Sequence, residues 1–243
     1  MIKKILKKVV ARLGYRLEPL HSTPPKNWFT MERALHRASN LFPNIATVID
    51  VGASDGRWSR ECMRSFKDAA YLLVEAQEAH LAGLNKFKSE FAHGDYVMAV
   101  AGATDGTILF DDSELFGGQA YSEGEGKNLK ELPQISLDKE IERRALAGPY
   151  ILKLDTHGFE VPILEGANRL LSDTELLIVE SYNFKLTDTS LRYWEMCQYL
   201  DKLGFAPIEN VDLMLREKDH VFWQMDTFFI KKNHSIFEYN KYE

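Results

Sequence analysis

The ten residues 47–56, TVIDVGASDG, constrain the fold of this chain more than any other stretch. Residues 47–51 are rich in β-branched side chains and lack polar alternation, which is typical of a strand buried on both faces of a parallel sheet. The small residues GASDG then interrupt the run, and a helix-like segment follows over residues 57–66. This order of strand, glycine loop and helix predicts a βα unit whose loop lets the backbone approach a ligand.

The spacing within this loop excludes two common phosphate-binding motifs. It reads D-x-G-x-x-x-G, which differs from the G-x-G-x-x-G of dinucleotide sites, and no Lys-Ser or Lys-Thr pair follows it as in a P-loop. Asp50 would also place a carboxylate beside a pyrophosphate. The loop therefore favours a ligand with a cationic or hydroxyl-bearing end; the alternative is a tight strand–helix turn that binds nothing.

A second buried strand, over residues 70–75, ends in an acid. Glu75 lies about 20 residues after the glycine loop, the spacing at which a strand-terminal carboxylate binds a ribose diol in nucleotide-binding sheets. We therefore predict that Glu75 binds ribose hydroxyls, the alternative being an exposed acid at a strand end. Further strands are predicted over residues 96–101 and 107–110. Residues 111–131 are rich in Gly, Ser and acids and predict a mobile lid or a disordered insertion.

The block 150–160, YILKLDTHGFE, again places polar residues directly after a strand, which is predicted over residues 150–154. Asp155 and His157 thereby reach the carboxyl edge of the sheet, where open α/β sheets bind ligands. A further strand over residues 176–180 ends in Glu180. Asp155, His157 and Glu180 have the atoms that suit a divalent ion, but no short-range spacing enforces such a site, so we predict no metal. Acidic residues from four strand ends are expected to meet at this edge, and a binding site explains this clustering better than chance. They are Asp50, Glu75, Asp155 and Glu180.

The rest of the chain continues the alternation of helices and strands. Helices are predicted over residues 161–171 and 190–203, and Ser136 is predicted to cap a helix that begins near residue 138. Residues 205–214 and 221–231 are predicted to form a closing hairpin. This order of elements predicts one α/β domain.

Composition narrows the classes of partner and compartment. A chain of 243 residues with 45% hydrophobic content suits one α/β domain with a small appendage. The net charge of −6 gives no reason to expect a nucleic acid as partner. Cys62 and Cys197 lack metal-type spacing and are typical of buried thiols in a reducing compartment, so we predict a cytoplasmic protein. No apolar run approaches the roughly 18 residues that span a bilayer.

Residues 1–20 differ in charge from everything that follows. They carry six basic side chains against a single acid, and their apolar residues recur at helical spacing. We expect residues 1–26 to form a basic amphipathic helix and a proline-containing linker, and residues 27–243 to form the main domain. In one interpretation the helix packs on the domain. In the other it lies on an anionic membrane surface, which would make the protein peripheral to the inner face of the membrane.

Several motifs together resemble one enzyme family. They are VIDVGASDGRWS, LLVEAQ, ISLD and, most specifically, LKLDTHGFEVPILEGA followed by LLIVES. In these motifs the chain resembles the FkbM family of S-adenosylmethionine-dependent methyltransferases, over roughly residues 44–232. The resemblance implies a class I, Rossmann-like methyltransferase fold, with a doubly wound, seven-stranded, mostly parallel sheet whose last strand is antiparallel. It also implies methyl transfer to oxygen, with hydroxyls of sugars, glycans or secondary metabolites as acceptors.

The resemblance also implies roles for particular residues. His157 is the expected base that removes the proton of the acceptor hydroxyl, since neutral imidazole titrates near working pH. Asp155 is the second candidate, as base or as the group that orients His157. Many family members carry Glu or Gln at the position of His157, so a histidine base would be specific to a subset, and the alternative is a residue that moves no proton. The residues expected to contact S-adenosylmethionine are Asp50, Gly52, Ala53, Asp55, Gly56, Glu75, Ala76, Gln77, Val100, Ala101 and Asp155.

Two other functions fit the same motifs. One is a catalytically silent module that binds the cofactor within a glycan or cell-envelope assembly. The other is a methyltransferase that acts on nitrogen. A nucleic-acid methyltransferase is disfavoured by the acidity of the chain. Neither the acceptor nor the oligomeric state follows from the sequence.

Overall fold

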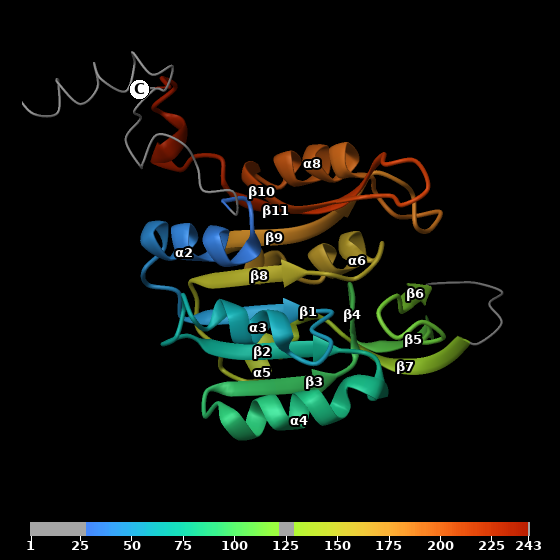
Figure 1. Cartoon of the computed structure of the whole chain (residues 1–243). Coiled ribbons are helices and arrows are strands. Elements are labelled where there is room, and N and C mark those ends of the chain that lie inside the picture. Colours follow the sequence, from blue (N-terminus) through green and yellow to red (C-terminus); the bar gives the residue numbers. More distant parts are fainter. Residues whose placement is uncertain (1–27, 122–128, 243) are drawn as a thin grey trace, which may run out of the picture.

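Seven strands form the central sheet of the protein, in the spatial order β10-β11-β9-β8-β1-β2-β3 (Figure 1). The computed structural model describes residues 28–121 and 129–242. The last strand, β11, is antiparallel to both of its neighbours, and the other neighbouring strands are parallel, which confirms the predicted sheet. The strands span Thr47–Val51 (β1), Ala70–Glu75 (β2), Gly94–Met98 (β3), Tyr150–Leu154 (β8), Thr174–Tyr182 (β9), Phe205–Leu215 (β10) and Phe222–Lys231 (β11).

The central strands confirm the burial expected from their apolar runs. β1 and β8 are buried along their whole length and pair in register, from Thr47 opposite Tyr150 to Val51 opposite Leu154. β2 pairs with β1 on its other side. Continuous apolar sequences suit these strands because helices cover both faces of a parallel sheet.

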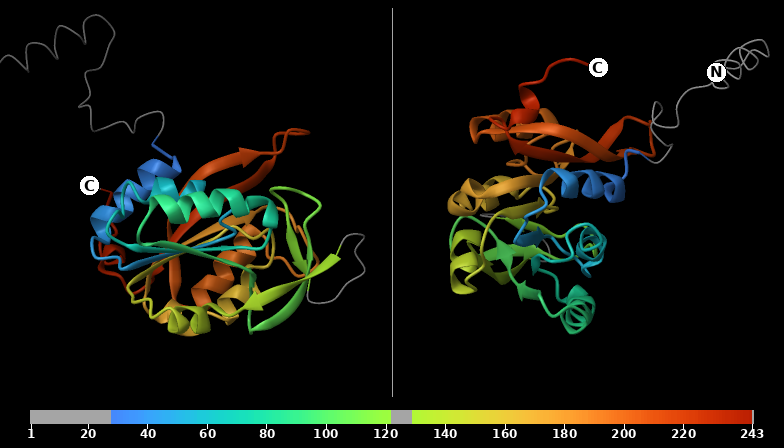
Figure 2. Two further views of the ribbon diagram at one scale, coloured as in Figure 1. Left: turned by 90° about the horizontal axis from the view of Figure 1, so that it is seen from below. Right: turned by 90° about the vertical axis from the view of Figure 1, so that its left-hand side faces the viewer.

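Helices pack on both faces, so the sheet is doubly wound (Figure 2). Along β1, Val48 belongs to the core that contains Leu84 of α4, and Ile49 belongs to the opposite core, which contains Leu200 of α8. This alternation follows from the two-residue period of a strand. The helices span Met31–Leu41 (α2), Arg57–Cys62 (α3), Leu81–Glu90 (α4), Leu137–Arg143 (α5), Glu160–Glu165 (α6), Asn168–Ser172 (α7) and Tyr193–Lys202 (α8), with short 3-10 helices at Glu78–His80 (η1) and Ser235–Phe237 (η2).

Two elements predicted as continuous are interrupted. The strand predicted over residues 96–101 leaves the main sheet after Met98, and Val100–Ala101 (β4) pairs instead with another sheet. The helix predicted over residues 161–171 breaks into α6 and α7 at Gly166. A Cβ on Gly166 would lie 2.1 Å from the backbone oxygen of Gly102, so the break allows this turn to pack directly on the loop after β4.

A second sheet, in the order β4-β7-β5-β6, lies beside the carboxyl ends of the main strands (Figure 1). The prediction that residues 111–131 are irregular is therefore wrong for the part that β6 and the start of β7 occupy, while residues 122–128 lie outside the described part. β7 reads LKELPQI and gives a weak strand signal because it is polar and contains proline. Its pairing with β5 holds it in the sheet. The strands span Gly106–Asp111 (β5), Gln119–Tyr121 (β6) and Leu129–Ile135 (β7).

The N-terminal segment lies outside the described residues, which begin at residue 28. The basic helix predicted within residues 1–26, and the domain boundary after it, therefore stay predictions. Among the helices of residues 28–121 and 129–242, none is long and apolar enough to cross a membrane.

Candidate functional site

The carboxyl ends of the parallel strands border one cavity of about 590 Å³. It is lined by Gly52 after β1, Glu75 at the end of β2, Asp155 after β8 and Glu180 in β9. Parallel strands end at a common edge, so residues far apart in the chain meet here. The volume lies within the range of small-molecule sites.

The loop after β1 packs directly against the end of β8. Gly52 has a φ of 77°, in the left-handed region, and a Cβ on it would lie 1.9 Å from the backbone oxygen of Asp155. Only glycine combines this conformation with so close an approach. Gly52 thus allows the loop after β1 to lie directly beside the polar residues that follow β8.

Glu75 joins the loops that follow β1 and β2. Its Oε2 accepts a hydrogen bond from the backbone N–H of Ser54 at 2.7 Å, and its Oε1 accepts one from the backbone N–H of Gln77 at 2.8 Å. The side chain is buried yet lines the cavity. A carboxylate oxygen has two acceptor sites, so each oxygen keeps one for a ligand hydroxyl.

Part of the segment predicted as a lid forms one wall of the cavity. The backbone oxygen of Leu115 accepts a hydrogen bond from Gln77 Nε2 at 3.3 Å and lies 2.9 Å from His80 Nε2. The ring of Phe116 lies 5.4 Å from the ring of His80 and 5.1 Å from the guanidinium carbon of Arg57. This wall closes the side of the cavity next to Glu75.

Three of the predicted cofactor contacts do not line the cavity. Asp50 is fully buried in β1, where its Oδ2 accepts a hydrogen bond from Ser59 Oγ of α3 at 2.7 Å, and burial raises its pKa to about 6. Asp55 pairs with the Arg57 guanidinium at 2.9 Å, and Gly56 is the N-cap residue of α3. Strand alternation and the start of α3 turn these positions away from the cavity. The predicted contacts that do line it are Gly52, Ala53, Glu75, Ala76, Gln77, Val100, Ala101 and Asp155.

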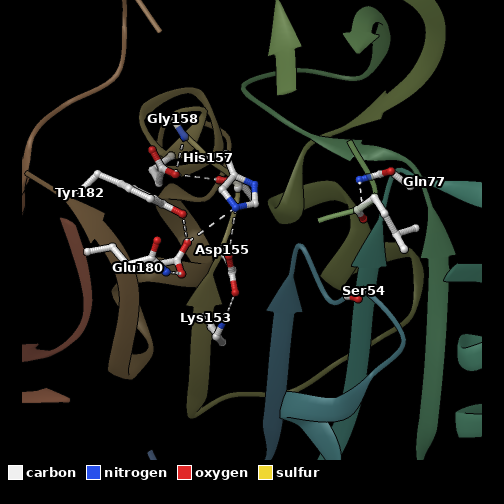
Figure 3. A network of polar contacts seen from close by, with 12 residues as sticks. Ser54, Gln77, Lys153, Asp155, His157, Gly158, Glu180 and Tyr182 are labelled. Atoms are coloured by element: carbon white, nitrogen blue, oxygen red, sulfur yellow. Dashed lines mark hydrogen bonds and ion pairs between the residues drawn. The ribbon is translucent and has the colours of Figure 1, made fainter. Parts of the chain in front are cut away.

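A group of polar contacts joins β8 to β9 at the other end of the cavity (Figure 3). Lys153 Nζ donates a hydrogen bond to Asp155 Oδ2 at 2.7 Å. The hydroxyl of Tyr182 donates to Glu180 Oε2, and the carboxyl groups of Asp155 and Glu180 share a hydrogen bond. His157 Nε2 lies 4.0 Å from Asp155 Oδ1 and 3.8 Å from Glu180 Oε2. The structure thus brings the two predicted catalytic residues together and adds Glu180.

The backbone of His157 adopts an unusual conformation. Its φ is 51°, in the left-handed region that non-glycine residues seldom occupy. The next residue, Gly158, also has a positive φ, and its N–H donates to Glu160 Oε1 at 2.9 Å. Such backbone strain is concentrated at functional positions. Here it places the imidazole beside two carboxyl groups at the cavity.

The charges of this group are set by burial and by each other. Burial, reinforced by the charge of Asp155, raises the pKa of Glu180 to about 9, so Glu180 is protonated at neutral pH. Burial also opposes ionisation of Asp155, but the Lys153 ammonium and the hydrogen bond with Glu180 outweigh it and lower the pKa of Asp155. For Lys153, the surrounding carboxylates outweigh burial and raise its pKa. The site therefore holds one ionised and one neutral carboxyl group beside an ammonium.

We expect a Glu180→Gln variant to gain stability relative to wild type as the pH rises from 5 to 9. Folded Glu180 keeps its proton up to a pKa of about 9, whereas the unfolded chain loses it near the ordinary value of 4.5. The folded state thus binds more protons within this window, and this lowers the wild-type free energy of unfolding by up to about 1.4 kcal/mol per pH unit. Glutamine does not titrate. Urea denaturation at several pH values measures the difference; the exposed Glu165→Gln variant should follow wild type, and a Glu180→Gln curve parallel to wild type would contradict the assignment.

Three side chains of this group of polar contacts also have the geometry to hold a metal ion. Asp155, His157 and Glu180 each offer a ligand atom, and these atoms lie within 4.8 Å of one another. The Lys153 ammonium already supplies a positive charge 2.7 Å from Asp155. The ionised carboxylate is thus balanced by the protein itself, and the prediction that the site binds no metal stays a prediction.

Several residues of the cavity were not singled out from the sequence. A signal existed for Lys153, because a lone charge within the buried strand YILKL requires a partner. Trp58 of α3, Tyr182 of β9 and Gln224 of β11 carried no such signal, since their places at the cavity depend on how the helix and hairpin pack.

Comparisons with known proteins identify a family for this chain and a solved structure with a similar fold. The model of the methyltransferase FkbM domain matches residues 50–207. The solved structure of methyltransferase FkbM from Methylobacillus flagellatus KT has a TM-score of 0.51 and 15% identity, over 85% of this chain and 49% of its own, so this chain spans about half its length. Precorrin-6y C5,15-methyltransferase from Geobacter metallireducens GS-15 has a TM-score of 0.48 and 11% identity, over 87% and 94% of the two chains. No curated protein matches in sequence.

Proposed function

Because the chain belongs to the FkbM family of methyltransferases, we propose that it transfers a methyl group from S-adenosylmethionine to a hydroxyl oxygen of a sugar, glycan or secondary metabolite. Membership of the family makes the chain a methyltransferase and S-adenosylmethionine its cofactor. The proposal that oxygen is the acceptor atom rests on the position of His157 Nε2. It lies at the cavity, 3.8 and 4.0 Å from two carboxyl groups and thus beyond hydrogen-bond reach of both.

The cavity fits S-adenosylmethionine in size and in chemistry. Glu75 has acceptor sites left for the two ribose hydroxyls, next to the loop that holds Gly52. Ala76 and the segment Val100–Ala101 offer apolar contacts for the adenine. The acids at the cavity complement a ligand with a positive charge. We assign the Glu75 end to the cofactor and the His157 end to the acceptor.

The residues of the chain supply alignment and proton removal. When bound, S-adenosylmethionine supplies an electrophilic methyl carbon on a positively charged sulfur. His157 Nε2 accepts the proton of the acceptor hydroxyl, and the ionised Asp155, 4.0 Å away, stabilises the imidazolium that results. Lys153 and Glu180 fix the orientation of Asp155 through their hydrogen bonds. The cavity would hold the hydroxyl beside the methyl donor, and such alignment is the main requirement of this reaction.

Transfer of an isotopic label tests the proposal. The purified protein is incubated with methyl-13C-labelled S-adenosylmethionine and with fractionated glycan and small-molecule extracts, and NMR distinguishes methyl ether from N-methyl carbons. We expect labelled methyl ethers. Label found only on nitrogen would contradict the proposal in favour of an N-methyltransferase. Tight cofactor binding without transfer to any fraction would contradict it in favour of a catalytically silent binding module.

We expect a Glu75→Gln variant to lose recognition of the ribose. The wild-type protein should bind adenosine about tenfold more tightly than 2′-deoxyadenosine, because a hydrogen bond to a charged group contributes about 1.5–3 kcal/mol. The variant should distinguish the two much less, since an amide cannot accept from the backbone and from both hydroxyls. Calorimetric titration measures both affinities. The exposed Glu78→Gln variant should behave as wild type. If Glu75→Gln still bound adenosine about tenfold more tightly than 2′-deoxyadenosine, Glu75 would only hold the two loops together and would not bind the ribose.

A further inference from the structure

The cavity offers few cations to the carboxylate of the cofactor. S-adenosylmethionine carries an amino group and a carboxylate at the end of its chain, in addition to the positively charged sulfur. Six acidic residues line the cavity, and they complement the sulfur and the ammonium but oppose the binding of a carboxylate. Among the described residues that line the cavity, only Arg57 and Lys153 carry a permanent positive charge. One of these two is therefore expected to meet the carboxylate.

Lys153 is not available to a ligand. Its side chain is 3% exposed, and its ammonium donates a hydrogen bond to Asp155 Oδ2 at 2.7 Å. The carboxylates of Asp226 and Asp50 attract the same ammonium, so its charge is balanced within the protein. Arg57 remains, because its side chain is 66% exposed and lines the cavity.

The guanidinium of Arg57 is held in place and keeps donors for a ligand. Its Nε and Nη2 atoms donate hydrogen bonds to the two carboxylate oxygens of Asp55, each at 2.9 Å. The centre of the Phe116 ring lies 5.1 Å from the guanidinium carbon, within the range of a cation–π contact. A guanidinium has five N–H donors, and Nη1 donates to no residue in the described part of the chain. Ion pairs at the surface are weak, so the pair with Asp55 orients the guanidinium without preventing it from binding a ligand anion.

A chain of contacts places Arg57 at the cofactor end of the cavity. The ring of Phe116, which lies against the guanidinium, is 5.4 Å from the ring of His80. His80 Nδ1 lies 3.4 Å from Ser54 Oγ, and the backbone N–H of Ser54 donates to Glu75 Oε2 at 2.7 Å. All five residues line the cavity. The guanidinium thus belongs to the same wall as the carboxylate that we assign to the ribose.

We propose that Arg57 binds the carboxylate of S-adenosylmethionine through Nη1 and so fixes the amino-acid end of the cofactor beside the glycine loop. The inference rests on the cofactor of the proposed function and is independent of the atom that accepts the methyl group. A planar guanidinium matches a carboxylate in both charge and geometry. The sulfur lies between the ribose and the amino-acid end, so holding one at Glu75 and the other at Arg57 restricts the position of the methyl group.

Two ligands that differ only in the carboxylate test the inference by binding. Wild type and an Arg57→Gln variant of the full chain are titrated calorimetrically with S-adenosylhomocysteine and with its decarboxylated form, which keeps the adenosine, the sulfur and the amino group. Arg57→Gln should bind S-adenosylhomocysteine about tenfold more weakly than wild type, the effect of one hydrogen bond between charged groups. Its affinity for the decarboxylated form should not fall. An equal loss for both ligands, or a loss for neither, would overturn the inference.

Two further variants separate charge from other effects. Arg64 is exposed, lies just after α3 and does not line the cavity, so Arg64→Gln should bind both ligands as wild type does. Arg57→Lys keeps the positive charge without the planar group and should retain more affinity for S-adenosylhomocysteine than Arg57→Gln. Equal losses in Arg57→Lys and Arg57→Gln would contradict a role for the charge. Urea denaturation should give the same stability for wild type and Arg57→Gln, because Arg57 is exposed.

Failure of this inference and failure of the proposed function give different results. If wild type bound neither ligand, the assignment of the cofactor would fail and the inference with it. If wild type bound S-adenosylhomocysteine but Arg57→Gln showed no loss specific to the carboxylate, only the inference would fail. The choice between oxygen and nitrogen as acceptor affects neither result, because binding is measured without an acceptor.

Discussion

Turnover of a His157→Ala variant is expected to fall by about 10²–10⁴-fold, the contribution of a general base. Its affinity for S-adenosylhomocysteine should stay within about threefold of wild type, because His157 lies at the end of the cavity opposite to Glu75. Single-turnover kinetics and calorimetric titration measure the two quantities separately.

The backbone of His157 calls for a second variant. Because its φ is 51°, alanine would add strain that has nothing to do with proton transfer. His157→Asn removes the imidazole and keeps a residue that accepts the left-handed conformation, so it should lose turnover to a similar extent. The exposed His93→Ala variant, at the start of β3, should keep wild-type turnover. Wild-type turnover in His157→Asn would rule out His157 as the general base.

Gly52→Ala is expected to have the largest effect on the folded state, a loss of about 3–5 kcal/mol in the free energy of unfolding. The new Cβ would lie 1.9 Å from the backbone oxygen of Asp155, and the φ of 77° adds a penalty of its own. Either the loop or the end of β8 has to move. Both ends of the cavity depend on this contact, so affinity for S-adenosylhomocysteine should fall together with stability. Urea denaturation and titration measure the two effects.

Gly204 provides the matched control. It also has a positive φ, 86°, but a Cβ there would meet no atom within 4 Å. Gly204→Ala should therefore show the conformational penalty alone, about 1 kcal/mol, with unchanged cofactor affinity. Equal destabilisation by the two substitutions would mean that the contact between Gly52 and Asp155 contributes nothing beyond the backbone conformation.

Elements with a strong local signal were predictable from the sequence. β1, β2 and β8 begin and end at the predicted residues because each is a continuous apolar run bounded by small or polar residues. The meeting of Glu75, Asp155 and Glu180 was predictable too, because the topology of a parallel sheet brings all strand ends to one edge. Ser136 caps α5, as its place before the helix indicated.

Features that depend on packing between distant segments were not predictable. Asp50 lies one residue before the end of β1 and close to the glycine loop, yet the position of α3 gives its side chain a partner in Ser59 and keeps it out of the cavity. β7 becomes a strand only because β5 pairs with it. Glu61, Asp212 and Asp226 line the cavity from α3, β10 and β11, and no spacing in the sequence encodes that arrangement.

A crystal structure of the complex with S-adenosylhomocysteine would locate both ends of the site in one measurement. We expect the ribose hydroxyls to contact Glu75, the adenine to lie against Val100–Ala101, and the sulfur to face the space beside Asp155 and His157. A sulfur that points away from His157, or a cofactor bound outside this cavity, would contradict the proposed function.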